Sequence, residues 1–262
     1  KKFRGTPAQL KTYAIGQTVT AITRRAKWLI LELASGYGFV IHLKMTGQLL
    51  YQKKSDPEFL GGHTMNNEKT MLPSNHTRVI FEFSDGSKVY FQDMRKFGYV
   101  ELYSAKDIEQ YFIQKNLGIE PMDKTFTFEY FRTQLQRHSK TTIKAVLLNQ
   151  SIVAGLGNIY VDDTCWQAKV QPMRLVGNLT LDEQKALYRA AKKIIAEAIK
   201  LGGTSFSHYY RVDGTLGQYW HKRKVYGRTG EPCRRCKTLI EKTRCAGRGT
   251  HYCPKCQQYG NC

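Results

Sequence analysis

The chain has 262 residues and a formal net charge of +20, from 41 Lys and Arg against 21 Asp and Glu. This length allows two domains with sizeable cores, and a charge this positive favours a polyanionic partner. No apolar run approaches the roughly 20 residues that span a bilayer, which argues against a membrane protein. Seven cysteines and no signal-like N-terminus favour a reducing, cytoplasmic setting.

The first part of the chain, residues 1–105, is predicted to be rich in β-strands. Apolar and polar residues alternate in several short segments separated by turn residues. Strands are expected at 18–22, 28–33, 38–51 with an interruption at Gly47, 78–83 and 88–91. The last two form a hairpin, whose Asp85-Gly86 suits a primed turn. This spacing predicts an antiparallel sandwich or flattened barrel, with a polar loop at 52–74.

From about residue 106 the apolar residues follow a helical period. The clearest helix begins after Thr180, which forms a capping box with Glu183, and is stopped by Gly202. Two shorter helices are expected at 141–149 and about 158–168. Residues 203–222 have no period and carry several glycines, which predicts a mobile loop.

The C-terminal part has the spacing C-x2-C-x16-C-x2-C, formed by Cys233, Cys236, Cys253 and Cys256. Each Cys-x-x-Cys pair offers two sulfurs from one tight turn, and four thiolates bind Zn²⁺ as a closed tetrahedral site. The sequence therefore predicts one structural zinc ion, with two disulfides as the alternative. The basic, glycine-bearing segment 243–252 is predicted to be a hairpin tip.

Three groups of residues could carry binding or catalysis. Asn158, which follows Gly155-Leu-Gly157, could cap a helix or donate its amide to a phosphate, and the charge of +20 favours the phosphate. Lys27 is expected on the leucine face of strand 28–33, where desolvation could lower its pKa for proton transfer; a solvated surface lysine is the alternative. Met45, Arg95 and Phe97 are either core and surface residues or side chains that fill the gap left by an extruded nucleotide.

Taken together, the motifs resemble the formamidopyrimidine-DNA glycosylase family, bacterial repair enzymes that remove oxidised purines such as 8-oxoguanine. The matching segments run in family order from about residue 14 to 257. They are Arg24-Arg-Ala-Lys27, His42-Leu-Lys-Met45-Thr-Gly47, Asp93-Met-Arg95-Lys-Phe97-Gly98, Leu117-Gly-Ile-Glu-Pro121, Val153-Ala-Gly-Leu-Gly-Asn158-Ile-Tyr160, Val225-Tyr-Gly-Arg228 and Ala246-Gly-Arg248-Gly-Thr-His-Tyr-Cys253. Each segment is weak alone, but the combination is specific.

The resemblance implies an α+β fold in three parts. Residues 1–105 would form a β-sandwich catalytic domain that lacks its first segment. Residues 106–222 would form a helix–two-turn–helix DNA-binding domain, with a lesion-capping loop at about 203–219. Residues 223–262 would form a four-cysteine zinc finger whose hairpin enters DNA.

The resemblance also implies roles for single residues. Lys27 is similar to the family lysine that assists base release and β-elimination, and Arg248 to the finger arginine that holds the lesion phosphates and is linked to δ-elimination. Met45, Arg95 and Phe97 match the side chains that fill the gap, with Phe97 beside the orphaned base. The implied DNA contacts are His76, Arg95, Asn158 and, more loosely, Lys140.

The chain departs from the family pattern at its start. The family nucleophile is an N-terminal proline, followed by a glutamate, in a Pro-Glu-Leu-Pro-Glu start. This sequence opens Lys-Lys-Phe-Arg, so roughly thirty residues are expected to be missing upstream of Lys27, and the chain by itself is expected to be impaired. Smaller departures are Arg78, where the family often has histidine, and a longer loop at 52–74.

The resemblance implies a bifunctional DNA glycosylase and abasic-site lyase of base excision repair. Such an enzyme flips an oxidised purine out of duplex DNA, releases it by Schiff-base chemistry, and cleaves the strand by β,δ-elimination. The alternatives are a non-catalytic binder of damaged or abasic DNA and an endonuclease VIII-type glycosylase for oxidised pyrimidines. The expected partner is double-stranded DNA with an oxidised purine or abasic site, bound by a monomer in the bacterial cytoplasm, at the nucleoid.

Overall fold

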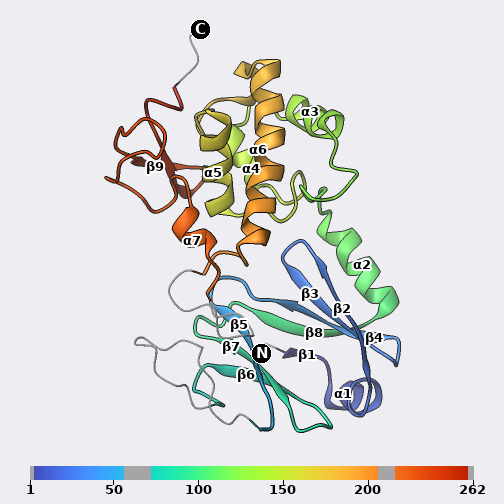
Figure 1. The fold of residues 1–262 in the computed structure, drawn as a ribbon. Coiled ribbons are helices and arrows are strands. Elements are labelled where there is room, and N and C mark those ends of the chain that lie inside the picture. The colour runs from blue at the N-terminus through green and yellow to red at the C-terminus, as the bar shows by residue number, and fades with distance from the viewer. Residues whose placement is uncertain (1–2, 56–71, 206–215, 259–262) are drawn as a thin grey trace. The chain divides into compact units, whose positions relative to one another are not determined.

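The computed structural model describes residues 3–55, 72–205 and 216–258, which form two compact units (Figure 1). The first unit contains the described residues up to Lys115, together with those of Thr204–Gly217. The second contains Asn116–Gly203 and the described residues from Gln218 onward.

The first unit is built on two sheets, and the predicted β-sandwich is confirmed. Five strands have the order β1-β8-β4-β3-β2, and three have the order β5-β7-β6. The five are Phe3–Arg4 (β1), Val19–Arg25 (β2), Trp28–Leu33 (β3), Tyr37–His42 (β4) and Tyr99–Ser104 (β8); the three are Gly47–Gln52 (β5), Thr77–Glu82 (β6) and Lys88–Asp93 (β7). Apart from the parallel β1–β8 pair, the neighbouring strands named here are antiparallel.

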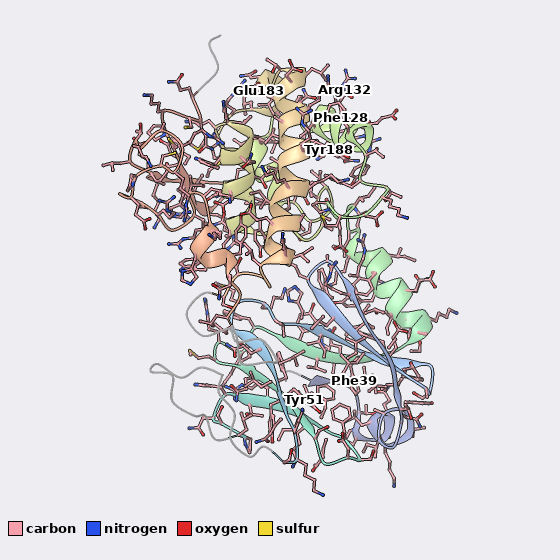
Figure 2. The ribbon with its side chains drawn as sticks, in the orientation of Figure 1. Phe39, Tyr51, Phe128, Arg132, Glu183 and Tyr188 are labelled. Atoms are coloured by element: carbon pink, nitrogen blue, oxygen red, sulfur yellow. The ribbon has the colours of Figure 1, made fainter. Side chains whose placement is uncertain are left out.

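The core of this unit lies between the two sheets. Phe39 of β4, labelled in Figure 2, points into this core. Its ring meets that of Phe81 of β6 edge to face with centroids 5.1 Å apart, and Phe91 is fully buried in the same cluster. Burying each such side chain stabilises the fold by about 1.5–3 kcal/mol. The other face of the five-stranded sheet is covered by α2 (Ala105–Lys115), where Phe112 packs against Trp28.

Two strand predictions need correction. The segment 38–51, predicted as one run interrupted at Gly47, is two strands in different sheets, because the Gly47 N–H donates to the Leu43 carbonyl at 2.9 Å and closes a turn between them. Lys27 is exposed in the two-residue turn between β2 and β3, so it does not lie on the leucine face. Among the turn residues, Ala26 has a φ of +50°.

The turn type of one hairpin was predicted wrongly, and one helix was not predicted. The loop at Asp85-Gly86 closes between Phe83 and Ser87, and within it Gly86 alone has a positive φ, so it is a three-residue hairpin and not a primed turn. Helix α1 (Pro7–Tyr13) was missed, although Thr6 and Gln9 form a capping box and proline stands at its first position.

The second unit is helical and carries a C-terminal hairpin (Figure 1). Its elements are α3 (Phe128–Arg137), α4 (Ile143–Leu148), α5 (Asn158–Ala168), the 3-10 turn Val176–Asn178, α6 (Leu181–Lys200), α7 (Tyr219–Lys222), β9 (Glu241–Cys245) and β10 (Arg248–Tyr252). The predicted capping box of Thr180 and Glu183 is present at the start of α6. In Figure 2, Phe128 of α3 faces Tyr188 of α6, with ring centroids 5.9 Å apart. None of the described helices is long and apolar enough to cross a membrane.

The predicted loop at 203–222 ends in ordered structure. Its central residues, 206–215, lie outside the described residues, as does most of the expected lesion-capping loop. Tyr219, by contrast, begins α7 and is fully buried, and its hydroxyl donates to Asp163 at 2.8 Å. Asp163 also accepts main-chain hydrogen bonds from Lys224 and Val225, so this carboxylate fixes the entry to the zinc module.

Candidate nucleic-acid interface and zinc centre

Met45, Arg95 and Phe97 lie together on the surface of the first unit and are called the gap-filling cluster below, after the role predicted for them. The Arg95 guanidinium stacks over the Phe97 ring at 4.9 Å, and its Nη1 lies 3.4 Å from the sulfur of Met45. Met45 is 68% exposed and Phe97 is 51% exposed. Large apolar side chains this exposed are not core residues, so the core interpretation was wrong. Their arrangement suits insertion between stacked bases.

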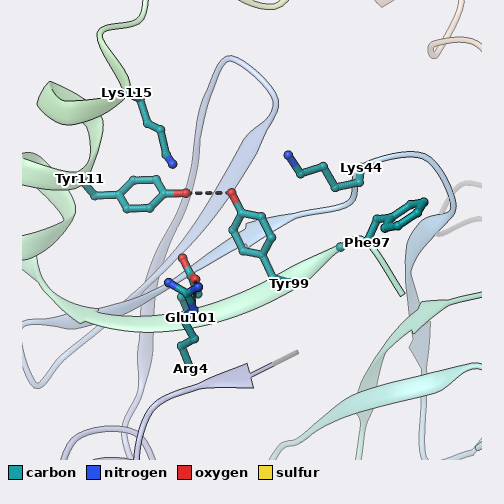
Figure 3. Close-up of a pocket in the computed structure, with 8 residues that line it drawn as sticks. Arg4, Lys44, Phe97, Tyr99, Glu101, Tyr111 and Lys115 are labelled. Carbon is teal, nitrogen blue, oxygen red and sulfur yellow. Dashed lines mark hydrogen bonds and ion pairs between the residues drawn. The ribbon is translucent and has the colours of Figure 1, made fainter. Parts of the chain in front are cut away.

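A polar cavity of about 350 Å³ opens beside Phe97 (Figure 3). The hydroxyls of Tyr99 and Tyr111 are 2.8 Å apart within it, and Lys44 and Lys115 line it with their ammonium groups. Burial raises the pKa of Tyr111, so its hydroxyl remains protonated. The cavity therefore offers hydroxyl and ammonium donors next to the gap-filling cluster.

His42 borders this region, and sequence reasoning assigned it no role. Its ring is buried between Trp28 and Tyr99, and its Nδ1 accepts a hydrogen bond from the Lys44 N–H at 2.9 Å. Burial, followed by the charges of nearby lysines, lowers the pKa of His42 to about 4. A neutral imidazole agrees with this hydrogen bond, because a ring nitrogen that accepts a hydrogen bond cannot carry a proton.

Two other predicted DNA contacts, His76 and Lys140, and the predicted catalytic Lys27 lie on turns. His76 is half-buried just before β6, and its carbonyl accepts the Asp93 N–H at 2.9 Å. Lys140 is exposed in the turn between α3 and α4. Lys27 is exposed on the β2–β3 turn of the first unit.

The two turns between α4 and α5 are held by an extended segment of the same unit. The Gly118 N–H donates to Gln150, and the Ala154 N–H donates to Ile119. A Cβ on Gly118 would lie 2.4 Å from the Ile152 carbonyl, so only glycine allows this approach. The segment Leu117–Pro121 is therefore part of the scaffold for Asn158.

Asn158 is the first residue of α5 and does not cap it. Gly157 is the cap residue, and the Asn158 Nδ2 instead donates to the main-chain carbonyl of Gly249 in β10, 2.9 Å away. Its Oδ1 is buried without a hydrogen-bond partner among the described residues. Arg248, next to Gly249, is exposed at the start of β10.

A buried ion pair that the sequence did not indicate supports the same hairpin. Lys144 and Asp162 are fully buried, with Nζ and Oδ1 2.5 Å apart, and Nζ also reaches the Gly249 carbonyl at 3.0 Å. The other oxygen of Asp162 accepts the His251 N–H at 2.8 Å. In the sequence, each partner looks like an ordinary helical residue. Only the fold brings these two side chains, 18 positions apart, together beside a strand that lies far along the chain.

The four predicted zinc ligands come together, with their sulfurs all within 4.8 Å of one another. The pairs Cys236–Cys253 and Cys233–Cys256 have sulfurs 3.4 and 4.0 Å apart, close to the about 3.8 Å expected around a tetrahedral zinc and too far for disulfides. Hydrogen bonding from Thr238 lowers the pKa of Cys236 to about 6, whereas burial raises the pKa of Cys253 and of Cys256, so the case for zinc rests on the sulfur geometry. The indole of Trp166 donates to Cys233 at 3.4 Å. The residues fit one structural zinc ion.

An exposed apolar cluster beside cations, two tight turns before a helix, and a hairpin beside a four-cysteine site are all suited to binding duplex DNA. The fold and site are those of a zinc-finger protein that binds DNA. Three family models match it: the formamidopyrimidine-DNA glycosylase N-terminal domain over residues 1–100, its H2TH domain over 117–209, and the zinc finger found in FPG and IleRS over 230–258. The chain belongs to the formamidopyrimidine-DNA glycosylase family, whose members are DNA glycosylases of base excision repair.

Similar proteins cover nearly the whole chain. The formamidopyrimidine-DNA glycosylase of Listeria monocytogenes is 38% identical over 252 residues, which are 96% of this chain and 86% of that protein. The Lactococcus lactis enzyme is 39% identical over 95% of this chain and 85% of its own length. A solved complex of Lactococcus lactis Fpg with DNA containing an abasic site has a TM-score of 0.82 and 36% identity, covering 96% of this chain and 86% of that one. A MutM complex with DNA containing carbocyclic 8-oxo-G gives the same four values.

Proposed function

We propose that the protein excises oxidised purines, 8-oxoguanine and formamidopyrimidines, from duplex DNA and then cleaves the strand by β,δ-elimination. The observation that carries this proposal is the gap-filling cluster, because exposed apolar side chains beside a guanidinium suit the hole left by a flipped nucleotide. Similar proteins bound to abasic-site and 8-oxo-G DNA support the same class of substrate.

Each predicted site residue has a role in this proposal. An amine attacks C1′ of the sugar, the glycosidic bond breaks, and the Schiff base then serves as the electron sink for strand cleavage. Lys27, exposed on its turn, assists base release and β-elimination. Arg248 and Asn158 hold phosphates at the lesion, with His76 and Lys140 as further backbone contacts. Zinc supplies structure alone, because four protein ligands leave no open position.

Borohydride trapping tests the proposal against a non-catalytic binder. The full-length protein should form a covalent adduct with a duplex containing 8-oxoguanine opposite cytosine, and the adduct should not form with the intact duplex. Tight binding without any adduct would support the binder instead. An adduct formed with oxidised pyrimidine but not with 8-oxoguanine would favour the endonuclease VIII-type alternative.

We further propose that the protein acts as a monomer in the bacterial cytoplasm, at the nucleoid. The support is the set of bacterial relatives and a DNA substrate. A fluorescent fusion should follow the DNA stain in cells, and a fusion found at the envelope would contradict this location. Sedimentation should give the mass of a single chain, and a mass of two chains would contradict the monomer.

A further inference from the structure

Asp93, the last residue of β7, lies beneath the gap-filling cluster and is completely buried. Its Oδ1 accepts a hydrogen bond from the Thr46 hydroxyl at 2.5 Å, and its Oδ2 accepts the Gly98 N–H at 2.7 Å. Its main-chain carbonyl accepts from Nε of Arg78 at 3.1 Å. One carboxylate therefore joins the turn that carries Met45 to the segment that carries Arg95 and Phe97.

Thr46 makes this connection twice. Besides donating to Asp93, its hydroxyl oxygen accepts the Arg95 N–H at 3.1 Å. The two loops thus share a hydroxyl and a carboxylate directly below the exposed side chains. A buried carboxylate is unfavourable unless hydrogen bonds compensate its desolvation, and here two donors from two different loops do so.

The segment that carries Arg95 and Phe97 is also closely packed at Gly98. A Cβ on Gly98 would lie 2.7 Å from the Phe91 ring and 2.9 Å from the His42 carbonyl. Any other residue would push the segment away from Asp93. The close approach that glycine allows therefore keeps this segment against Asp93.

We propose that Thr46 and Asp93 are positioning residues that preorganise the gap-filling cluster and so set the preference for DNA with a missing base over intact DNA. This inference rests on the proposed function of the cluster. Side chains already held in place lose less conformational entropy on binding, and only a duplex with a gap can accept them. Affinity for intact duplex comes mainly from phosphate contacts elsewhere, so it does not depend on the link through Thr46 and Asp93, which is called the clamp below.

The test compares Thr46→Val, which keeps the shape and removes the hydroxyl, with Thr46→Ser, which keeps the hydroxyl. Dissociation constants are measured for a duplex with a tetrahydrofuran abasic analogue opposite pyrrolocytosine and for the intact duplex of the same sequence. Thr46→Val should lower the preference for the gapped duplex, expressed as the ratio of its affinity to that of the intact duplex, about 10-fold. Binding to the intact duplex should not change, and the fluorescence change of the opposite base should be weaker. Thr46→Ser should retain both properties.

Thr20→Val is the matched control, because Thr20 of β2 donates its hydroxyl to the main-chain carbonyl of Glu32 in β3, within the five-stranded sheet and away from the cluster. It should leave the ratio within about twofold of wild type. In a Phe97→Ala background, Thr46→Val should cause a much smaller further loss, since Thr46 acts through the cluster. An unchanged ratio in Thr46→Val, an equal loss in Thr46→Ser, or a full additive loss in the Phe97→Ala background would overturn the proposal.

The wild-type result separates this inference from the function on which it rests. Wild-type protein that shows no preference for the gapped duplex would contradict the proposed function, and the clamp with it. Wild-type preference that survives in Thr46→Val would overturn the clamp alone. Asp93→Asn, which keeps one acceptor oxygen, should lower the ratio in the same direction as Thr46→Val.

Discussion

The side-chain amide of Asn158 donates a hydrogen bond to the carbonyl of Gly249, 2.9 Å away. Gly249 follows Arg248 in β10, so one proposed phosphate contact is tied to the strand that carries the other. The buried ammonium of Lys144 reaches the same carbonyl at 3.0 Å. The two-turn segment and the finger hairpin are therefore one connected support for the DNA backbone.

Replacing Asn158 with Asp should weaken binding to abasic duplex by at least about 10-fold. The carboxylate has the same shape, but it cannot donate to Gly249 and adds a negative charge at the proposed phosphate contact. Asn178→Asp is the matched control, since it adds the same charge at an exposed position of the same unit and should change binding by less than about twofold. Equal effects of the two variants, measured by fluorescence anisotropy, would remove the assigned role.

Breaking the ion pair beneath the hairpin should reduce stability. Lys144→Met leaves the Asp162 carboxylate buried without its cation and should lower the free energy of unfolding by about 3–5 kcal/mol. Adding Asp162→Asn should recover part of this loss, because the uncompensated charge is then gone. Urea unfolding of the single and double variants measures both. A single variant that loses less than about 1 kcal/mol would show that the pair is not needed.

Replacing Arg248 with Ala should weaken binding to abasic duplex by about 1–3 kcal/mol and reduce the slope of log affinity against log salt by about 1. Lys255→Ala removes another exposed charge of the finger and should have a smaller effect on both. Binding is measured between low and moderate salt. An unchanged affinity at moderate salt would exclude Arg248 as a phosphate contact.

Chelation of zinc should unfold the finger and abolish DNA binding while the sandwich remains folded. The small core around the site contains Cys233 and Cys253 together with Trp166, Val225 and Ile240, so it depends on the ligands staying together. Released zinc is measured with a colorimetric indicator, DNA binding by anisotropy, and the sandwich by its β-sheet circular dichroism. Full DNA binding after complete zinc release would contradict this role.

His42 should make stability fall as the pH is lowered from about 6.5 towards 4. Its pKa is about 4 when folded and about 6.5 when unfolded, so between these values the unfolded chain alone takes up the proton. The contribution is fully present above the unfolded pKa and is lost as the pH falls through the folded pKa. His42→Gln should flatten this part of the curve. A ring resonance of His42 that titrates near pH 6.5 by NMR would contradict the prediction.

Local patterns determined much of the architecture. The cysteine spacing predicted the zinc ligands, Thr180 and Glu183 predicted the start of α6, and alternation predicted the sandwich, because each signal lies within a few residues of what it specifies. The prediction that Lys27 lies on a strand face was wrong because it rested on local alternation alone. Alternation continues smoothly through position 27, but pairing of Arg25 with Trp28 makes it a turn residue.

Tertiary structure alone decided which residues support the candidate site. Asp93 and Thr46 are 47 positions apart, and Lys144 and Gly249 are 105 apart, so no period or motif spacing connects them. Their burial is also invisible in sequence, where aspartate and lysine read as surface residues. The sequence determined which side chains could touch DNA; packing between distant segments decided how they are held, because buried charges are stable only where the fold supplies their partners.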